Sequence, residues 1–139
     1  MFVFNLQLFG GRGQGSYKIK NRIKGYNSPI IENDKLNYIL AKDKFKARYF
    51  NALGYTTATT NRLKKDISKK LKTNKALKYE NDEFGNEVYQ VNMQLGIKSK
   101  SVVTTAWVIP KGKSQPEFVS AYKNQKYNKG NGGENLWQK

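Results

Sequence analysis

Chemistry in this sequence has to come from amines, guanidiniums, hydroxyls and phenols, because none of the 139 residues is His or Cys. Without these two residue types the chain has no thiolate zinc ligand, no Cys nucleophile and no histidine-based catalytic triad. The glycine-rich segment near the start also lacks the G-x-x-x-x-G-K spacing of a nucleotide-binding loop. We therefore expect no metal and no cofactor.

Three cations lie close together in the sequence, Lys44, Lys46 and Arg48. Residues two apart on a helix point about 200° apart, so Lys46 and Arg48 could contact one phosphate only near the helix start or beside a sheet. Lys44 and Arg48 are four apart and share a side, which makes them the better aligned pair. The alternative is a solvated helix face with no part in chemistry.

The net charge is far above what solubility requires. The chain has 26 Lys and Arg against 10 Asp and Glu, a formal charge of +16. Such an excess predicts an anionic partner, and we favour RNA or DNA. Besides Lys44, the cations expected to contact phosphate lie on one predicted strand and one predicted helix face: Lys18, Lys20, Arg22 and Lys24, and Arg62, Lys65, Lys69 and Lys72.

Three short helices, predicted by apolar spacing, would position the first-half residues. Their apolar stripes are Leu36, Ile39 and Leu40 after an N-cap at Asn33, then Phe45, Tyr49, Phe50 and Leu53 before Gly54, then Leu63, Ile67 and Leu71 after Thr59 and Thr60. The third helix would pack through one side and present its four cations on the other.

The second half switches to the period of two that is typical of strands. We predict strands at Tyr89–Ile97, Val102–Ile109 and Phe118–Tyr122, and an earlier strand at Tyr17–Lys24 with its four cations on one face. The fold class is α+β, with three short helices packed on an antiparallel sheet of about four strands.

Three polar residues within these predicted strands are candidates for a site, Thr104, Thr105 and Ser120. A functional role requires them to converge with Lys46 or Arg48. The alternative is a structural role, which is ordinary for a mid-strand Thr.

The two ends differ in composition from the middle. Residues 1–16 form an apolar and Gly-rich arm, residues 17–123 the single domain, and residues 124–139 a tail rich in Asn, Gly and Lys. We expect both ends to be flexible. The apolar opening contains Asn5 and Gln7 and is too short to span a bilayer, so we expect no membrane association.

Four segments of the domain carry a resemblance: NDKLNYIL at 33–40, KARYFNALGY at 46–55, TAWVI at 105–109 and FVSAY at 118–122. Together they resemble a small bacterial and phage domain family without an established function. Its members typically have K-L-x-x-Y-L-L, H-K-A-R-F-F-x-x-L-G-Y, T-x-W-I-I and V-T-A-Y-P in that order. Two positions depart from the pattern, because Phe45 stands where the family often has His and Lys123 where it has Pro.

We liken that family to the barnase, colicin D and RelE-type ribonuclease folds. The resemblance implies an RNase-like domain, with Lys46, Arg48, Thr105 and Ser120 as the candidate catalytic residues. RNA cleavage through the 2′-hydroxyl needs a proton acceptor, a group that stabilises the phosphorane charge and a donor to the leaving oxygen. RelE-type enzymes use Lys, Arg and Tyr, so the missing His leaves both an active and a degenerate enzyme open.

The arm has a resemblance of its own. The segment NLQLFGGRG at residues 5–13 is similar to N-terminal segments on head-associated proteins of phages of Gram-positive bacteria. It implies a phage-borne protein that is docked on or packaged in the virion. The alternatives are an expression artefact and a frayed first strand with Phe2, Phe4, Leu6 and Leu8 on one face.

Three functions are compatible with these patterns. The preferred one is a phage- or mobile-element-borne, RNase-like domain that binds nucleic acid in the host cytoplasm. The second is a non-enzymatic phage inhibitor of a host nucleic-acid-dependent defence enzyme, acting through its cationic surface. The third is a virion protein that contacts packaged DNA and a phage head protein. Whether the domain is an enzyme, and its oligomeric state, stay open at this point.

Overall fold

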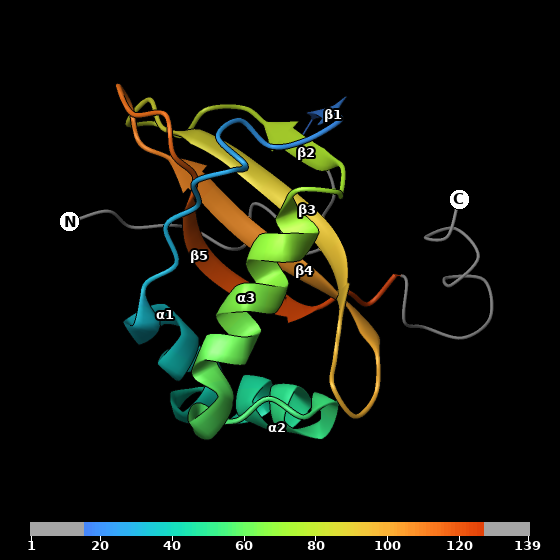
Figure 1. Ribbon diagram of the computed structural model, residues 1–139. Helices are drawn as coiled ribbons and strands as arrows, with labels where there is room; N and C mark the ends of the chain where they lie inside the picture. Colours follow the sequence, from blue (N-terminus) through green and yellow to red (C-terminus); the bar gives the residue numbers. More distant parts are fainter. Residues whose placement is uncertain (1–15, 127–139) are drawn as a thin grey trace.

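Helices cover one face of a five-stranded antiparallel sheet in this protein (Figure 1). The arrangement comes from a computed structural model in which residues 16–126 are described. The strands lie side by side in chain order: β1 Tyr17–Lys20, β2 Ala76–Tyr79, β3 Glu87–Leu95, β4 Ser101–Ile109 and β5 Glu117–Lys123. The predicted α+β fold class is therefore confirmed. Residues 1–15 of the predicted arm at 1–16, and residues 127–139 of the predicted tail, lie outside the described residues.

The described helical segments all lie between β1 and β2 in the chain. They are α1 Asn33–Asn37, the π-helical turn η2 Tyr38–Lys42, α2 Lys44–Leu53, the 3-10 turn η3 Thr57–Thr59 and α3 Thr60–Leu71. α2 begins where the Asp43 carboxylate accepts a hydrogen bond from the Lys46 backbone N–H, and it ends at Gly54. Gly54 has a φ of 108°, the left-handed conformation that glycine adopts at helix ends. No described helix is long and apolar enough to cross a membrane.

The main core lies between the helices and the side of the sheet that we call the helix-facing side. α3 packs on β3, and both contribute the residues that their spacing predicted: Leu63, Ile67 and Leu71, and Tyr89, Val91, Met93 and Leu95. All seven are buried. The apolar stripe of α3 and the alternation of β3 are therefore confirmed.

The opposite side of the sheet, called the outer face, has its own residues, because successive strand side chains alternate between sides. A second apolar cluster lies there, formed by Val88 and Ala106 with Tyr79, Val119 and Tyr122 packed against it. Four polar residues also lie on this face, because residues that pair directly across two strands point to the same side. They are Gln90 and Ser120, which pair with Ala106, and Asn92 and Thr104, which pair with each other. The outer face thus combines an apolar centre with hydrogen-bonding groups.

The sheet has one strand more than the sequence predicted. The extra strand is β2, which has only four residues and a single buried one, Ala76, so its alternation is hard to detect in the sequence. It pairs with β1, with Lys18 opposite Lys78. The sheet thus has five strands, close to the predicted number of about four.

The predicted strand at Tyr17–Lys24 is wrong in its length and in its cationic face. β1 ends at Lys20, and Ile23 beyond it is 1% exposed in the main core. Burying Ile23 takes the chain away from β2, so Arg22 and Lys24 do not share a strand face with Lys18 and Lys20.

Three local predictions also need correction. Asn33 is the first residue of α1 rather than its N-cap, which is Glu32. Phe45 is 86% exposed because it lies on the first turn of α2, about 140° around the helix from buried Phe50. β3 ends before Ile97, since Gly96 turns the chain with a φ of 142°.

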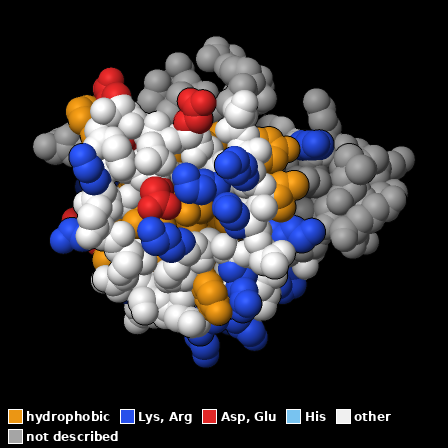
Figure 2. Space-filling view, turned by 90° about the horizontal axis from the view of Figure 1, so that it is seen from above, with side chains coloured by type: hydrophobic (Ala, Val, Ile, Leu, Met, Phe, Trp, Pro, Cys, Tyr) orange, Lys and Arg blue, Asp and Glu red, His pale blue; other side chains and the backbone are white. Residues whose placement is uncertain are grey.

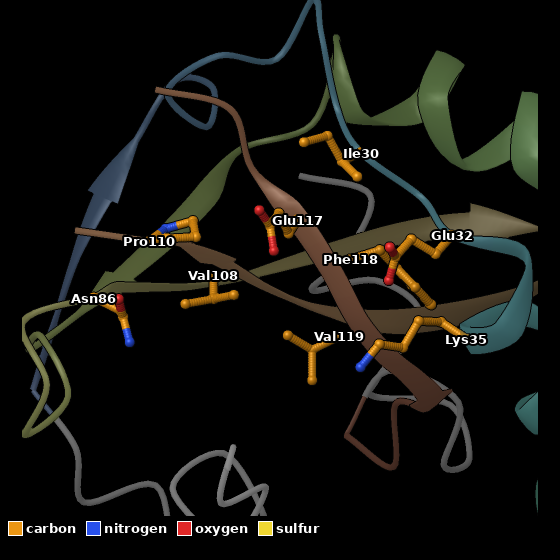
Figure 3. A pocket seen from close by; sticks show the side chains of 9 residues that line it. All are labelled: Ile30, Glu32, Lys35, Asn86, Val108, Pro110, Glu117, Phe118 and Val119. Carbon is orange, nitrogen blue, oxygen red and sulfur yellow. The ribbon is translucent and has the colours of Figure 1, made fainter. Parts of the chain in front are cut away.

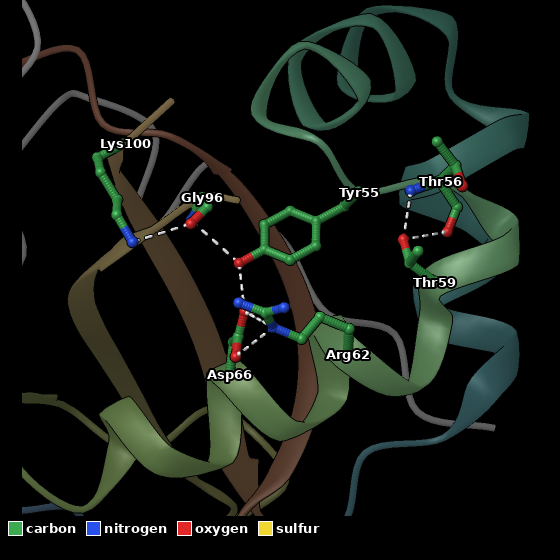
Figure 4. Close-up of polar contacts among 7 residues, drawn as sticks. All are labelled: Tyr55, Thr56, Thr59, Arg62, Asp66, Gly96 and Lys100. Atoms are coloured by element: carbon green, nitrogen blue, oxygen red, sulfur yellow. Dashed lines mark hydrogen bonds and ion pairs between the residues drawn. The ribbon is translucent and has the colours of Figure 1, made fainter. Parts of the chain in front are cut away.

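A buried phenol ties the helical layer to the β3–β4 turn (Figure 4). The Tyr55 hydroxyl donates to Asp66 Oδ2 at 2.6 Å and accepts from the Gly96 backbone N–H at 3.0 Å. Asp66 also accepts from Arg62 Nε at 3.1 Å. Burial and the hydrogen bond to Asp66 raise the pKa of Tyr55 well above its usual value, so the phenol stays protonated.

Replacing Tyr55 with Phe should lower the free energy of unfolding by about 1–3 kcal/mol, because the buried Gly96 N–H would lose its acceptor. Urea unfolding followed by circular dichroism measures this change. Tyr38→Phe is the matched control, since Tyr38 is 51% exposed and its replacement should cost less than about 0.5 kcal/mol. Equal stability of the two variants would contradict the assigned role of Tyr55.

Candidate active site

Lys46 and Ser120 meet at the β5 edge of the sheet, although 74 residues separate them in the sequence. Lys46 Nζ donates a hydrogen bond to Ser120 Oγ at 2.8 Å. The same ammonium lies 6.0 Å from the ring centroid of Tyr122, which is two residues further along β5. The first turn of α2, fixed by the Asp43 cap, thus directs a lysine toward a serine and a phenol.

The environment of Lys46 favours its neutral form more than water does. Burial lowers the pKa of Lys46 below its usual value, and the charge of Asp43 only partly opposes that shift. A lysine with a lowered pKa can accept a proton at a lower pH than an exposed lysine can. The Lys46 amine therefore lies beside a hydroxyl group and has a pKa below the ordinary lysine value.

A row of hydrogen bonds continues from Tyr122 across the outer face. Gln90 Nε2 donates to the Tyr122 hydroxyl oxygen at 3.1 Å, and the Tyr79 hydroxyl donates to Gln90 Oε1 at 3.2 Å. Burial, and to a smaller extent the electrostatic interaction with Tyr79, raises the pKa of Tyr122 to about 12. Tyr122 therefore stays a protonated phenol at neutral pH and can act as a donor.

A second polar group lies further along β3 and β4 on the same face. The Thr104 hydroxyl donates to Asn92 Oδ1 at 2.7 Å, and Asn124 Nδ2 donates to Thr104 Oγ1 at 2.8 Å and to Asn92 Oδ1 at 3.2 Å. Thr104 is 2% exposed. These bonds satisfy a polar cluster that would otherwise be costly to bury.

Of the four predicted catalytic residues, the structure brings together Lys46 and Ser120. Thr105 lies on the helix-facing side, opposite Ala121, and its hydroxyl donates to Val91 O at 2.7 Å and accepts from Trp107 Nε1 at 2.7 Å. Arg48 is exposed on α2, about 200° around the helix from Lys46. Lys44 is exposed as well, so the contact with the sheet belongs to Lys46 alone of these three cations.

Most of the predicted phosphate-binding cations lie on the helix-facing side or around its rim. Lys18 and Lys20 share a side with Lys78 and buried Ala76, and the exposed face of α3 has Lys65, Lys69 and Lys72. These five predicted cations have no ion pair within residues 16–126. Figure 2 shows Lys and Arg gathered at the centre and along the lower edge of the face viewed from above.

Three other predicted cations are engaged within the protein. Arg22 lies 4.5 Å from the Tyr26 ring centroid, and Arg62 pairs with Asp66. Lys24 Nζ lies 3.0 Å from Glu87 Oε2. Burial alone would raise the pKa of Glu87, but hydrogen bonds from Lys24 and Tyr89 outweigh burial and lower it. These exposed or half-exposed pairs each contribute little to stability, so the cations could exchange partners for phosphate.

A pocket of about 320 Å³ lies beside β4 and β5 (Figure 3). Val108 and Val119 form part of its lining, together with Glu32, Glu117 and Lys35. Two carboxylates against one ammonium make this pocket unfavourable for a phosphate group. Across residues 16–126, no group of three or more acidic side chains is gathered that could hold a metal ion.

The sequence did not single out Tyr122, Gln90 or Asn92 as site residues. A usable signal exists for two of them, because Gln90 and Asn92 alternate with the apolar residues of β3 and so must share the face away from the core. No spacing rule could place Tyr122 beside them, since that depends on the register of β4 and β5, which pairs Tyr122 with Thr104.

Fold and site together define a small basic α+β domain, in which a sheet covered on one side by helices presents a lysine, a serine and a tyrosine at its outer edge. The chain belongs to the family described as Domain of unknown function (DUF6883), whose model matches residues 22–125. The match covers most of the described domain and includes Lys46, Ser120 and Tyr122. No curated protein and no solved structure matches the chain.

Proposed function

We propose that this protein is a phage- or mobile-element-borne, RNase-like domain that binds RNA and cleaves it at the outer-face edge formed by Lys46, Ser120 and Tyr122. The observation that supports the proposal most strongly is the 2.8 Å contact between Lys46 Nζ and Ser120 Oγ beside the half-buried Tyr122 phenol. The net charge of +16 supports an anionic substrate.

The proposed reaction uses the 2′-hydroxyl of the substrate as nucleophile. Its oxygen attacks the adjacent phosphorus, the bond from phosphorus to the 5′-oxygen breaks, and a 2′,3′-cyclic phosphate and a 5′-hydroxyl form. Neutral Lys46 accepts the 2′-hydroxyl proton, and Tyr122 donates a proton to the leaving oxygen. Ser120 acts as a positioning residue that holds the Lys46 amine, and Gln90 holds the Tyr122 phenol.

The pH dependence of cleavage follows from the direction of the Lys46 shift. Because burial lowers the pKa of Lys46, the rate should rise with pH and level off below about 10.4, the ordinary lysine value. Initial rates on a short RNA across neutral to mildly alkaline pH measure the profile. Lys46→Arg should remove this titration, because guanidinium stays protonated throughout; an unchanged profile in that variant would assign the titration to another group.

Binding should depend steeply on salt. If about six phosphates are contacted, affinity for a generic RNA strand should fall by roughly 10³-fold between 50 and 200 mM salt. Fluorescence anisotropy with labelled RNA measures the slope. A slope near zero would contradict nucleic-acid binding, whereas an acidic protein partner should respond less, since its apolar contacts are not screened.

A second candidate function is favoured by where the cations lie. Lys65, Lys69 and Lys72 are on the helix-facing side, away from the Lys46–Ser120 edge. An anionic surface of a host enzyme, or packaged DNA in a virion, could bind there without any cleavage. In that case Lys65→Ala and Lys69→Ala should each weaken binding about tenfold, while no RNA product appears with the unmodified protein.

A further inference from the structure

Two tyrosines form an aromatic pair at the β1 end of the outer face. Tyr17 and Tyr79 are direct partners across β1 and β2, with ring centroids 5.4 Å apart and an interplanar angle of 49°. Tyr17 is 50% exposed, and Ile19, its neighbour on the same face, is 64% exposed. One aromatic ring and one aliphatic side chain are therefore exposed to solvent on a strand that lies at the edge of the described sheet.

A groove of about 480 Å³ borders this pair, a size suited to a small organic group. Its lining includes three lysines and one carboxylate: Lys18, Lys20 and Lys78 with Glu80. All three lysines leave their strands toward the helix-facing side, and Lys78 Nζ lies there, 5.8 Å from the Tyr89 ring centroid. Lys18 and Lys20 are on the edge strand β1, and a lysine stem is long enough to bring its ammonium around such a strand. The groove beside the aromatic pair is thus bordered by net positive charge.

We propose that the Tyr17–Tyr79 pair is a stacking subsite for an unpaired base of single-stranded nucleic acid, with the neighbouring lysines contacting its phosphates. The proposal rests on the proposed function and specifies the strandedness of its substrate. An aromatic ring offers every base a stacking surface, and a duplex keeps its bases stacked on one another. The combination of an exposed ring and the ammonium groups of Lys18 and Lys20 matches a base attached to a phosphodiester chain.

The position of the Tyr17–Tyr79 pair also suits a nucleic-acid chain that continues across the sheet to the proposed cleavage site. β1 and β5 are separated by four strand spacings of about 4.8 Å, or roughly 19 Å. Between them the outer face presents Tyr79, Gln90 and Tyr122 in one hydrogen-bonded row. A single strand lying across the sheet would have one base at Tyr17 and a phosphate near Lys46.

Binding to an oligothymidylate of about 12 nucleotides tests the subsite, because DNA lacks the 2′-hydroxyl and is bound without cleavage. Tyr17→Ala and Tyr17→Leu should each weaken binding by about 5-fold to 100-fold, whereas Tyr17→Phe should bind as the unmodified protein does. A DNA duplex of equal length should bind equally to all of them. Tyr38→Ala is the matched control, since Tyr38 is 51% exposed and lies on the helical layer.

Three other binding results would each overturn the stacking subsite, and they differ in what they say about the proposed function. If the unmodified protein binds the single strand and Tyr17→Ala binds it equally, the subsite is wrong and the proposed function stands. Equal affinity of Tyr17→Leu and Tyr17→Phe would show that the face takes an apolar partner rather than a base. Binding of neither oligothymidylate nor oligouridylate, the latter tested with the Lys46→Met variant, would overturn both the subsite and the proposed function.

Discussion

Replacing Lys46 with Met is expected to lower the rate of RNA cleavage by about 10²-fold or more, while the affinity for RNA changes far less. The Lys46 amine would handle a proton that moves only as the transition state forms, so its loss affects the rate rather than substrate binding. Met keeps most of the aliphatic length that the half-buried side chain packs with. Single-turnover rates and anisotropy with a short RNA measure the two quantities.

Two companion variants make this expectation specific. Lys44→Met removes an equal charge from the exposed part of the same helix turn and should leave the cleavage rate nearly unchanged. Ser120→Ala should lower the rate and shift the pH profile, because the Lys46 amine would lose the hydroxyl that positions it. Equal rates for Lys46→Met and Lys44→Met would contradict the assignment of Lys46 as a catalytic residue.

Replacing Trp107 with Ala is expected to reduce the free energy of unfolding by about 3–5 kcal/mol, the range for removing a large aromatic side chain from a core. Trp107 is fully buried on β4, packs edge-on against Phe118 with ring centroids 5.5 Å apart, and donates its indole N–H to Thr105. A loss of that size is a large part of the stability of an ordinary domain. Thermal or urea unfolding measures it.

The contribution of the Trp107 indole N–H hydrogen bond to the free energy of unfolding can be separated from that of the packing. Thr105→Val would keep the volume but leave the Trp107 N–H and the Val91 carbonyl without their hydroxyl partner, at a cost of about 1–3 kcal/mol. Unfolding of Trp107→Ala at the same urea concentration as the unmodified protein would contradict its position in the core.

The helical part of the fold and the long strands could be predicted because their periodicities are strong. Leu63, Ile67 and Leu71 recur at four-residue intervals, and Tyr89 to Leu95 alternate without interruption. The β1–β2 ribbon was harder, because every residue of β1 is exposed and its apolar residues therefore mark no core face. In this ribbon cross-strand pairing, not burial, defines the structure.

The candidate site was predicted in part for a similar reason. Lys46 and Ser120 could be named separately from residue type and motif, but their contact depends on how α2 approaches β5. Thr105 and Ser120 looked equivalent in the sequence, yet the register places them on opposite sides of the sheet, because Ser120 pairs with Ala106, the neighbour of Thr105. Local patterns encode which residues alternate, whereas tertiary packing decides which polar residues meet.

The most direct test of the central claim is the product of the reaction. A DNA oligonucleotide with one ribonucleotide should be cut by the purified protein only on the 3′ side of that ribonucleotide, leaving a 2′,3′-cyclic phosphate and a 5′-hydroxyl that mass spectrometry can identify. Lys46→Met should give at least about 10²-fold less of this product in the same time. No cleavage by the unmodified protein, or equal cleavage by Lys46→Met, would contradict the proposal that the Lys46–Ser120 edge is a ribonuclease active site.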